Sequence, residues 1–313
     1  MLSKLFGQGK KKEEERARGK LVKLPDGLRQ SIISSLGSKA IPSMPKASHQ
    51  AFQLATNPNA DARDYIEVLE ADEGLSARVL KIANSVFYDR GGGSKTIEQA
   101  VAVIGIAELK GLLNASALSG IFPLKHPLRA QFWAHNIASA LTARQICRMC
   151  LPASSDQAFL GGMMHDVGKL LLLQQHTDLY ERVFRHGIAN SLESTVAESE
   201  EYPFNHTHVG QAIGEQWNFS PDLLQIIKCH HDQWKDIEPK SLVGIVKASS
   251  IVSHSLGLGA GKDAFLLKRT YEPMLPEAFE YLGLPMARQK ELMREAELSF
   301  NSEFELYESW GAG

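Results

Sequence analysis

The adjacent residues His165 and Asp166 are the part of this sequence whose types and spacing most directly suggest chemistry. They lie in the run Gly-Gly-Met-Met-His-Asp-Val-Gly-Lys at positions 161–169. Imidazole nitrogen and carboxylate oxygen are ligands that divalent transition metals accept. Neighbouring positions on a helix point about 100° apart, so both side chains can reach one ion only if it lies near the helix edge, with partner helices closing over it. The pair therefore predicts a metal site built from several helices.

Four further histidines can complete such a site, namely His135, His206 and the adjacent His230 and His231. The predicted helices that carry these residues and the His-Asp pair span 131–148, 159–175, 206–217 and 221–231, and a fifth covers 242–254. An alternative remains open, in which His165 and Asp166 only hydrogen-bond to each other and to neighbouring helices, because buried polar groups need such partners.

The isolated histidines of the chain carry no comparable signal. A single histidine on a mixed helix is more often an ordinary hydrogen-bonded core or surface residue than a ligand. We therefore expect ordinary structural roles for His49, His126, His176, His186 and His254.

Composition and charge limit the classes of function. The 313 residues are 43% hydrophobic, enough to build a substantial core divided between two compact lobes. The net charge of −2 gives no reason to expect a nucleic-acid partner. Residues 1–20 carry seven Lys or Arg against three Glu, and so predict a disordered charged tail of +4 on a body near −6.

Cysteine number and hydropathy indicate the compartment. Cys147, Cys150 and Cys229 are too few for a disulfide framework, which favours a reducing interior. Cys147 and Cys150 form a C-x-x-C without the strand-helix-strand pattern of a redox site, so we expect two thiols one turn apart beside the core. No run of eighteen uncharged apolar residues exists, and we expect a soluble, cytoplasmic protein with no membrane span.

Helical periodicity extends along the rest of the chain. Asp61 and Thr96 are predicted helix caps, Gly91 to Ser94 interrupt the chain, and Pro127 is the best boundary between lobes. Residues 259–274 are expected to form a loop, followed by helices over 276–282 and 286–307. Met293, Ala296, Phe300, Phe304 and Tyr307 form a stripe on the last of these that should dock on the body.

The predicted fold class is all-α, a two-lobed helical bundle, because no alternating strand pattern or fixed repeat is found. The expected division is a tail at 1–20, an amino-terminal helical lobe at 21–127, a helical domain carrying the site at 128–260 and a carboxy-terminal helical extension at 261–313.

The order of the site residues resembles a known superfamily. One His, then His-Asp thirty residues later, then His206-Thr-His-Val-Gly210, then His-His, is similar to the HD superfamily of metal-dependent phosphohydrolases. The closer resemblance, over about residues 25–260, is to the HDOD family of bacterial signalling proteins. The amino-terminal motifs that carry it are Ile41-Pro-Ser-Met-Pro, Asp72-Glu-Gly-Leu75, Ala83-Asn-Ser-Val-Phe-Tyr88 and 100–105.

The resemblance implies roles for these residues, and an HD-type core for the domain at 128–260. His135, His165 and Asp166 would be metal ligands. His206, His230 and His231 would serve a second ion or a phosphate, His206 being also a candidate catalytic residue. Lys169 would stabilise phosphate charge at the mouth of the site. The implied cofactor is a divalent metal, Fe, Mn, Mg or Ni.

One departure from the superfamily pattern bears on activity. Catalytic members close the metal shell with an Asp from the fifth helix, and here Ser249 or Ser250 stands in that place, beside Lys247. A neutral hydroxyl is a poor ligand for a hard cation. The Gly-Tyr-Pro loop of the related cyclic-dinucleotide phosphodiesterases is also missing after His231.

Two functions follow from this pattern. The favoured one is a regulatory signal-transduction module with degenerate or absent hydrolase activity, whose partners are other signalling proteins and whose ligand could be a nucleotide. The alternative is a metal-dependent phosphohydrolase or phosphodiesterase acting on a nucleotide or cyclic dinucleotide.

Overall fold

The computed structural model describes residues 23–44, 46–56, 60–85, 87–88, 91–123 and 125–311. Within these ranges the chain is helical, with no strand, which confirms the all-α fold class. The predicted tail at 1–20 lies outside the described residues.

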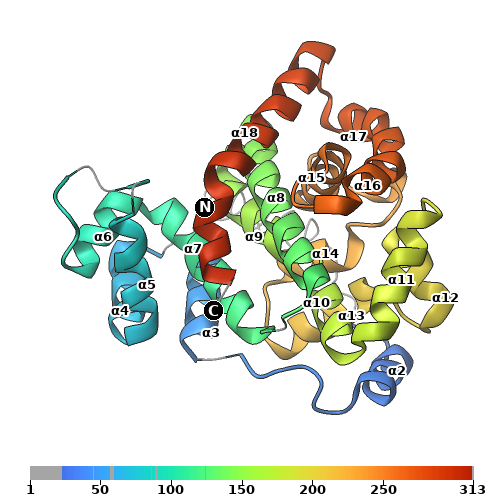
Figure 1. Ribbon diagram of the computed structural model, residues 1–313, viewed down its shortest axis with the longest axis horizontal. Helices are drawn as coiled ribbons and strands as arrows, with labels where there is room; N and C mark the ends of the chain where they lie inside the picture. Colours follow the sequence, from blue (N-terminus) through green and yellow to red (C-terminus); the bar gives the residue numbers. More distant parts are fainter. Residues whose placement is uncertain are drawn as a thin grey trace, which may run out of the picture.

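The helices follow one another along the chain with short connections (Figure 1). They are α2 (Asp26–Leu36), α3 (Lys46–Thr56), α4 (Ala62–Glu70), α5 (Glu73–Ala83), α6 (Ile97–Ile104), α7 (Ile106–Ile121), α8 (Pro127–Cys150), α9 (Ser155–Met164), α10 (Val167–Gln175), α11 (Thr177–Ala189), α12 (Ser194–Glu201), α13 (His206–Gln216), α14 (Pro221–Cys229), α15 (Leu242–Leu256), α16 (Ala264–Tyr271), α17 (Leu275–Leu282) and α18 (Met286–Gly311). Short 3₁₀ turns cover Pro152–Ser154, Trp234–Asp236, Gly261–Asp263 and Glu272–Met274.

Local sequence signals set several of these boundaries. Asp61 forms a capping box with Asp64 at the start of α4, and the Thr96 hydroxyl accepts a hydrogen bond from the Gln99 amide at the start of α6. Pro127 occupies the first turn of α8, where its missing N–H costs nothing. The predicted caps are therefore confirmed.

Helix α8 is the centre of the domain that carries the candidate site. It is buried along most of its length and packs against α9, α15 and α18, as Figure 1 shows for the green helix at the middle of the molecule. An apolar core continues from Leu36 on α2 through Leu112 on α7 to Leu171 on α10. Arg29 and the Leu24 amide both bond the carboxylate of Glu215, so α2 lies against α13. The division into the four predicted segments stays a prediction.

The carboxy-terminal helix docks on the body as its apolar stripe predicts. Ala296, Phe300 and Tyr307 are buried, and α18 lies against both α7 and α8. Arg144 of α8 donates hydrogen bonds of 2.9 Å to Glu108 of α7 and 2.6 Å to Glu303 of α18. This buried guanidinium therefore links three helices from distant parts of the sequence.

The expectation of a loop at 259–274 is wrong. Helix α16 and two 3₁₀ turns occupy the segment, and Leu267 and Tyr271 bury their side chains. Gly257 and Gly259, both in the left-handed region, end α15 and turn the chain. The glycines and lysines of the segment suggested a loop, whereas burial of two side chains on one face of α16 stabilises a helix.

The cysteines behave as ordinary thiols. The Cys147 thiol donates to the Leu151 carbonyl and the Cys150 thiol to the Ile146 carbonyl, and neither forms a disulfide. Burial raises the pKa of Cys147 to about 11 and also raises that of Cys150, so both stay protonated. The structural interpretation of the C-x-x-C is confirmed.

The hydropathy of the described helices bears on whether any of them could cross a membrane. No single helix among them combines the length and apolar composition needed to cross a membrane; α15 and the stretch Gly261–Leu282 reach the threshold only together, across an 89° bend.

Replacing Arg144 by Met should destabilise the fold while keeping the apolar stem of the side chain. Glu108 and Glu303 would lose their partner in a setting where their side chains are only 18% and 21% exposed. We expect the free energy of unfolding to fall by about 2 kcal/mol, less than for a fully buried pair. Urea unfolding would measure it. Arg288→Met, which breaks the exposed pair with Glu291, is the control, and an equal loss in both variants would contradict this account.

Candidate metal centre

The chain breaks its helix at the His-Asp pair. Helix α9 ends at Met164 and α10 begins at Val167, so His165 and Asp166 lie in the turn between them. The single helix expected over 159–175 is therefore wrong. The break removes the 100° separation that a continuous helix imposes, and His165 Nε2 lies 3.5 Å from Asp166 Oδ2.

Two glycines let the neighbouring helices come close to this turn. A Cβ on Gly162 would lie 2.6 Å from Ala140 Cα, so α9 could not pack as closely on α8 with any other residue. A Cβ on Gly168 would lie 2.0 Å from the His206 carbonyl oxygen, which fixes α10 against α13. The two glycines flank the pair, and Gly162 allows the approach of α8, which carries His135, while Gly168 allows the approach of α13, which carries His206.

Asp166 is the point on which the predicted residues converge. Its carboxylate oxygens lie 3.1 Å from His206 Nε2, 3.5 Å from His230 Nε2 and 3.8 Å from His135 Nε2. Potential ligand atoms within 4.8 Å of one another form two sets that share Asp166, one with His206, His230 and His231, the other with His135 and His165. The structure thus brings together all six residues that the sequence proposed.

Two imidazoles use Nδ1 to donate to backbone carbonyls, which turns their Nε2 atoms toward Asp166, where His230 Nε2 also lies 3.4 Å from His206 Nε2. His165 Nδ1 donates to the Gly162 carbonyl at 2.7 Å and His230 Nδ1 to the Ile227 carbonyl at 3.0 Å. In a neutral ring the other nitrogen, Nε2, then carries a lone pair. Among the described residues none donates a hydrogen bond to His165 Nε2, which is buried beside the carboxylate. A lone pair facing a carboxylate is an arrangement that a metal ion would satisfy.

Glu198 fixes the third imidazole and was missed by sequence reasoning. Its carboxylate accepts from His206 Nδ1 at 2.8 Å, from the His206 backbone amide at 2.7 Å and from the Tyr180 hydroxyl at 2.5 Å. It is 1% exposed, in an otherwise acidic surface helix. Nothing in the local sequence distinguishes Glu198 from Glu200 and Glu201, so only tertiary contacts identify it.

His254 also lies beside the cluster, although we expected an ordinary structural role for it. Its ring stacks on that of His135 with centroids 3.6 Å apart and a 9° interplanar angle, and Tyr271 stacks on its other side at 4.3 Å. It belongs to neither set of potential ligands. Its packing holds the His135 ring in place, a contact that appears only when α15 lies against α8.

The remaining single histidines have ordinary roles, as expected. His126 caps α8, His176 stacks on Tyr202, and His186 forms an exposed pair with Glu200. His49 is a partly buried residue of α3.

The structure distinguishes the two adjacent serines of α15 by their contacts. The Ser249 hydroxyl donates to the Val246 carbonyl of its own helix, whereas Ser250 Oγ lies 3.2 Å from His135 Nε2. Ser250 is therefore the residue that faces the cluster. Lys247, one turn earlier, places its Nζ 4.7 Å from the centre of the Trp234 ring and donates to the Asp232 carbonyl.

Lys169 is buried rather than placed at the mouth of the site. Its Nζ lies 2.8 Å from Asp166 Oδ2, and the residue is 5% exposed. It therefore neutralises the buried carboxylate directly. Its suggested contact with a phosphate stays a prediction.

Burial and charge set the protonation states of the cluster. Burial lowers the pKa of His165 to about 3 and lowers those of His135 and His230 as well. For Asp166, burial acts to raise the pKa, but the Lys169 ammonium and the hydrogen bonds with His206 and His230 outweigh burial and hold the pKa well below its usual value. The His206 ring differs, because burial acts to lower its pKa but the carboxylates of Glu198 and Asp166 outweigh burial and raise it. The neutral rings of His135, His165 and His230 beside an ionised carboxylate are in the protonation states that metal binding requires, whereas His206 would have to release its proton to an incoming ion.

Two hollows adjoin the cluster. A small cavity of about 30 Å³ is lined by Asp166, His135, Lys169 and the apolar side chains around them. A larger cleft of about 280 Å³ is lined by Glu193, His230, His231, Trp234, Lys247 and Ser250, with Tyr271 contributing to both.

The comparisons with known proteins place the chain in a family. The model of the HDOD domain matches residues 41–233. The chain belongs to the HDOD family. A protein of uncharacterised function from Treponema pallidum (strain Nichols) is 20% identical over 197 residues, which cover 61% of this chain and 38% of that protein. The chain thus spans well under half the length of this curated relative.

Solved structures share the fold of this HDOD protein. A protein from Marinobacter aquaeolei VT8 named for signal transduction has a TM-score of 0.72 at 19% identity, covering 94% of this chain and 68% of that one. An HDOD domain protein from Geobacter sulfurreducens has a TM-score of 0.64 at 18% identity, and the match covers 87% of this chain and 97% of that one. A protein from Shewanella amazonensis SB2B named as a phosphohydrolase has a TM-score of 0.66 at 23% identity, and the match covers 88% of this chain and 98% of that one. At these identities the likeness concerns the fold alone.

Replacing Glu198 by Gln should weaken metal binding without removing side-chain volume. The amide can no longer fix His206 as a carboxylate does, and loss of such supporting contacts costs about 10- to 100-fold in affinity. Titration calorimetry with Mn²⁺ would measure it. Glu200→Gln, on the exposed face of the same helix, is the matched control and should leave affinity unchanged; equal affinity in both variants would contradict the role assigned to Glu198.

The pH dependence of stability should report the buried neutral imidazole. Burial lowers the pKa of His165 in the folded protein to about 3, below its ordinary value of about 6.5, so the unfolded chain binds a proton that the folded one does not. Stability of the metal-free protein should therefore fall as pH drops below about 6.5. Urea unfolding between pH 7 and pH 4 gives the slope of the free energy of unfolding against pH. This slope should be shallower for His165→Asn than for wild type, by an amount equivalent to the uptake of up to one proton on unfolding. An unchanged slope would mean that His165 is charged in the fold.

Proposed function

We propose that this HDOD protein is a signal-transduction module in which the His/Asp cluster binds a divalent metal ion that stabilises or regulates the fold, with little or no hydrolase activity. The observation that carries the proposal is the convergence of the Nε2 atoms of His165, His206 and His230 near Asp166, with each Nδ1 already bonded to a carbonyl or carboxylate. This is how proteins orient metal-binding histidines.

The ligand set favours a transition metal. Fe, Mn and Ni accept imidazole nitrogen readily, whereas Mg prefers oxygen ligands and bound water. With five imidazoles and one carboxylate in the two sets, we place Mg last among these four candidates. When bound, such an ion would supply Lewis-acid character and positive charge beside Asp166.

The charge of the cluster argues against efficient two-metal hydrolysis. Asp166 is the one carboxylate in either set of potential ligands, and Ser250 offers only a neutral hydroxyl at the position facing His135. Lys169 adds a positive charge 2.8 Å from the same carboxylate. Two divalent ions would bring a charge of four against a single ligand carboxylate, so we expect the second ion to bind weakly.

The hydrolase alternative is favoured by one specific observation, the cleft beside His230 and His231. Its volume of about 280 Å³ approaches the size of small-molecule sites, and Lys247 and Trp234 offer a positive charge and an aromatic surface within it. A nucleotide could bind there with its phosphate toward the histidines. In a signalling module this nucleotide would be the regulatory ligand, and other signalling proteins would be the partners; no nucleic acid is expected.

Restoring the carboxylate separates the two functions. We expect purified protein to carry a divalent metal that His165→Ala and Asp166→Ala lose, and wild type to show no metal-dependent hydrolysis of bis(p-nitrophenyl) phosphate with Mn²⁺. Ser250→Asp should bind Mn²⁺ more tightly, by about tenfold, because an added carboxylate raises the charge of the ligand set. Elemental analysis, calorimetry and an absorbance assay measure these outcomes.

The matched control is Ser250→Asn, which has the size of Asp without its charge. Equal Mn²⁺ affinity in the Asp and Asn variants would show that residue 250 does not face the ion. Wild-type hydrolysis that is lost in Asp166→Ala would establish the enzyme in place of the module, and absence of metal under all conditions would leave the cluster as a network of hydrogen bonds.

A further inference from the structure

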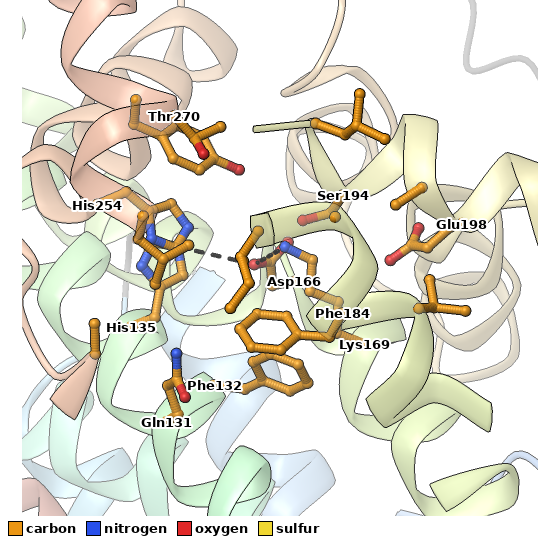
Figure 2. Close-up of a pocket in the computed structure, with 18 of the residues that line it drawn as sticks. Gln131, Phe132, His135, Asp166, Lys169, Phe184, Ser194, Glu198, His254 and Thr270 are labelled. Carbon is orange, nitrogen blue, oxygen red and sulfur yellow. Dashed lines mark hydrogen bonds and ion pairs between the residues drawn. The ribbon is translucent and has the colours of Figure 1, made fainter. Parts of the chain in front are cut away.

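An open groove lies between α17 and the first turn of α18, apart from the candidate metal centre. The cavity beside Asp166, by contrast, is lined by charged and apolar side chains of that centre (Figure 2). The groove has a volume of about 840 Å³, and its apolar lining consists of Leu275, Pro276, Phe279, Leu284, Pro285 and Met286. Met286 is 67% exposed. An adaptable side chain left open on an apolar groove is typical of a surface that binds another chain segment.

The rim of the groove is acidic. Glu272 and Glu280 line it, and Glu277 is exposed on α17. Between Arg269 and Arg288 the sequence contains these three glutamates, no aspartate and no lysine or arginine, so the stretch carries a net charge of −3. An occupant that fits the groove should therefore combine apolar side chains with positive charge.

The first twelve residues of the chain have this composition. Leu2, Leu5 and Phe6 follow the spacing of one helix face, and four lysines accompany them, Lys4 and Lys10 to Lys12. No acidic residue precedes Glu13. Apolar anchors at this spacing are the ones that helix-in-groove recognition uses. These residues lie outside the described part of the chain, and the match is between their sequence and the lining of the groove.

The chain is long enough to bring this segment to the groove. From Phe6 to Lys23, the first described residue, an extended chain can span about 55 Å, whereas a compact domain of this length has a radius of gyration of about 20 Å. Helices α2 and α17 lie on the same side of α8 in Figure 1, at the lower and upper right. Because segment and groove belong to one chain, the segment competes there at a higher effective concentration than a separate partner.

We propose that residues 1–12 of this chain dock in the groove between α17 and α18. Their apolar side chains pack against Met286, and their lysines face Glu272 and Glu280. Helix α17 also carries Glu277 into the cleft beside the histidine cluster, so the docked segment lies next to that cleft. The proposal needs no metal and is independent of the function proposed above.

Oxidation of exposed methionines tests whether the groove is covered. In full-length protein, hydrogen peroxide should oxidise Met286 more slowly than in the variant Leu5→Ser with Phe6→Ser, because a docked segment shields the thioether. The expected ratio is about tenfold, the protection given by a Kd of about 0.1 mM at an effective concentration of about 1 mM. Met149 of α8 is 42% exposed and does not line the groove, so its rate should be equal in both proteins.

Peptide mass spectrometry measures both rates, and equal Met286 rates in the two proteins would overturn the proposal. Protection of Met286 that disappears on dilution would place the segment of a second copy in the groove and would overturn docking within one chain. Thermal unfolding of the variant verifies that its fold matches that of wild type.

Charge reversal tests the contribution of the glutamate rim. The triple variant Lys10→Glu, Lys11→Glu and Lys12→Glu should lose most of the protection of Met286. The matched control reverses three basic residues that follow the segment, Arg16→Glu, Arg18→Glu and Lys20→Glu, and should keep it. Equal loss of protection in both variants would show a general attraction between tail and body and would contradict docking at the rim.

An anionic membrane is the other surface that apolar and basic residues in this order can bind. Cosedimentation with phosphatidylserine vesicles, measured beside the oxidation rates, separates the two. Vesicle binding by wild type together with unprotected Met286 would assign the segment to the membrane and overturn the proposal. Protection of Met286 in vesicle-free protein, lost in the lysine variant, would establish docking whether or not vesicles bind.

Discussion

The buried carboxylate of Asp166 is the constraint on which the site and its surroundings depend. A carboxylate that is 2% exposed loses most of its hydration, and the fold must supply compensating groups or leave a large energetic penalty. Lys169 provides one positive charge at 2.8 Å, and His206 and His230 surround one oxygen from two further helices. A metal ion would add positive charge that the neutral rings of His165 and His230 cannot provide.

The scaffold meets this demand by close approach of helices rather than by loops. The break between α9 and α10 turns His165 and Asp166 toward one point, and Gly162 and Gly168 allow α8 and α13 to approach to distances that a Cβ would prevent. Glu198 then fixes the His206 ring through its Nδ1 proton. Sites held in this way by packed helices keep their geometry better than sites on mobile segments.

The candidate metal centre of this HDOD chain thus combines five imidazoles with a single carboxylate. Ser250 presents a neutral hydroxyl to His135, and two spaces adjoin the cluster, one lined in part by Lys247 and Trp234 and a smaller one lined by Asp166 and Lys169 together with Phe132 and Phe184. Fewer negative charges weaken binding of a second ion, while open space on two sides leaves a single ion reachable by ligands.

The sequence alone determined the helical class, the caps at Asp61 and Thr96, and the six converging residues, because periodicity, caps and ligand order are local or ordered properties of the chain. It could not determine the break at His165, the helix at Ala264–Tyr271, or the roles of Glu198, His254 and Ser250. Each of these depends on contacts between residues far apart in sequence: Glu198 is one of several similar glutamates until it meets His206, and the two serines 249 and 250 become distinct only when α15 is rotated against His135. The sequence specifies which residue types are capable of chemistry. Their orientation and charge environment depend on how the helices pack, and only the tertiary structure shows this packing.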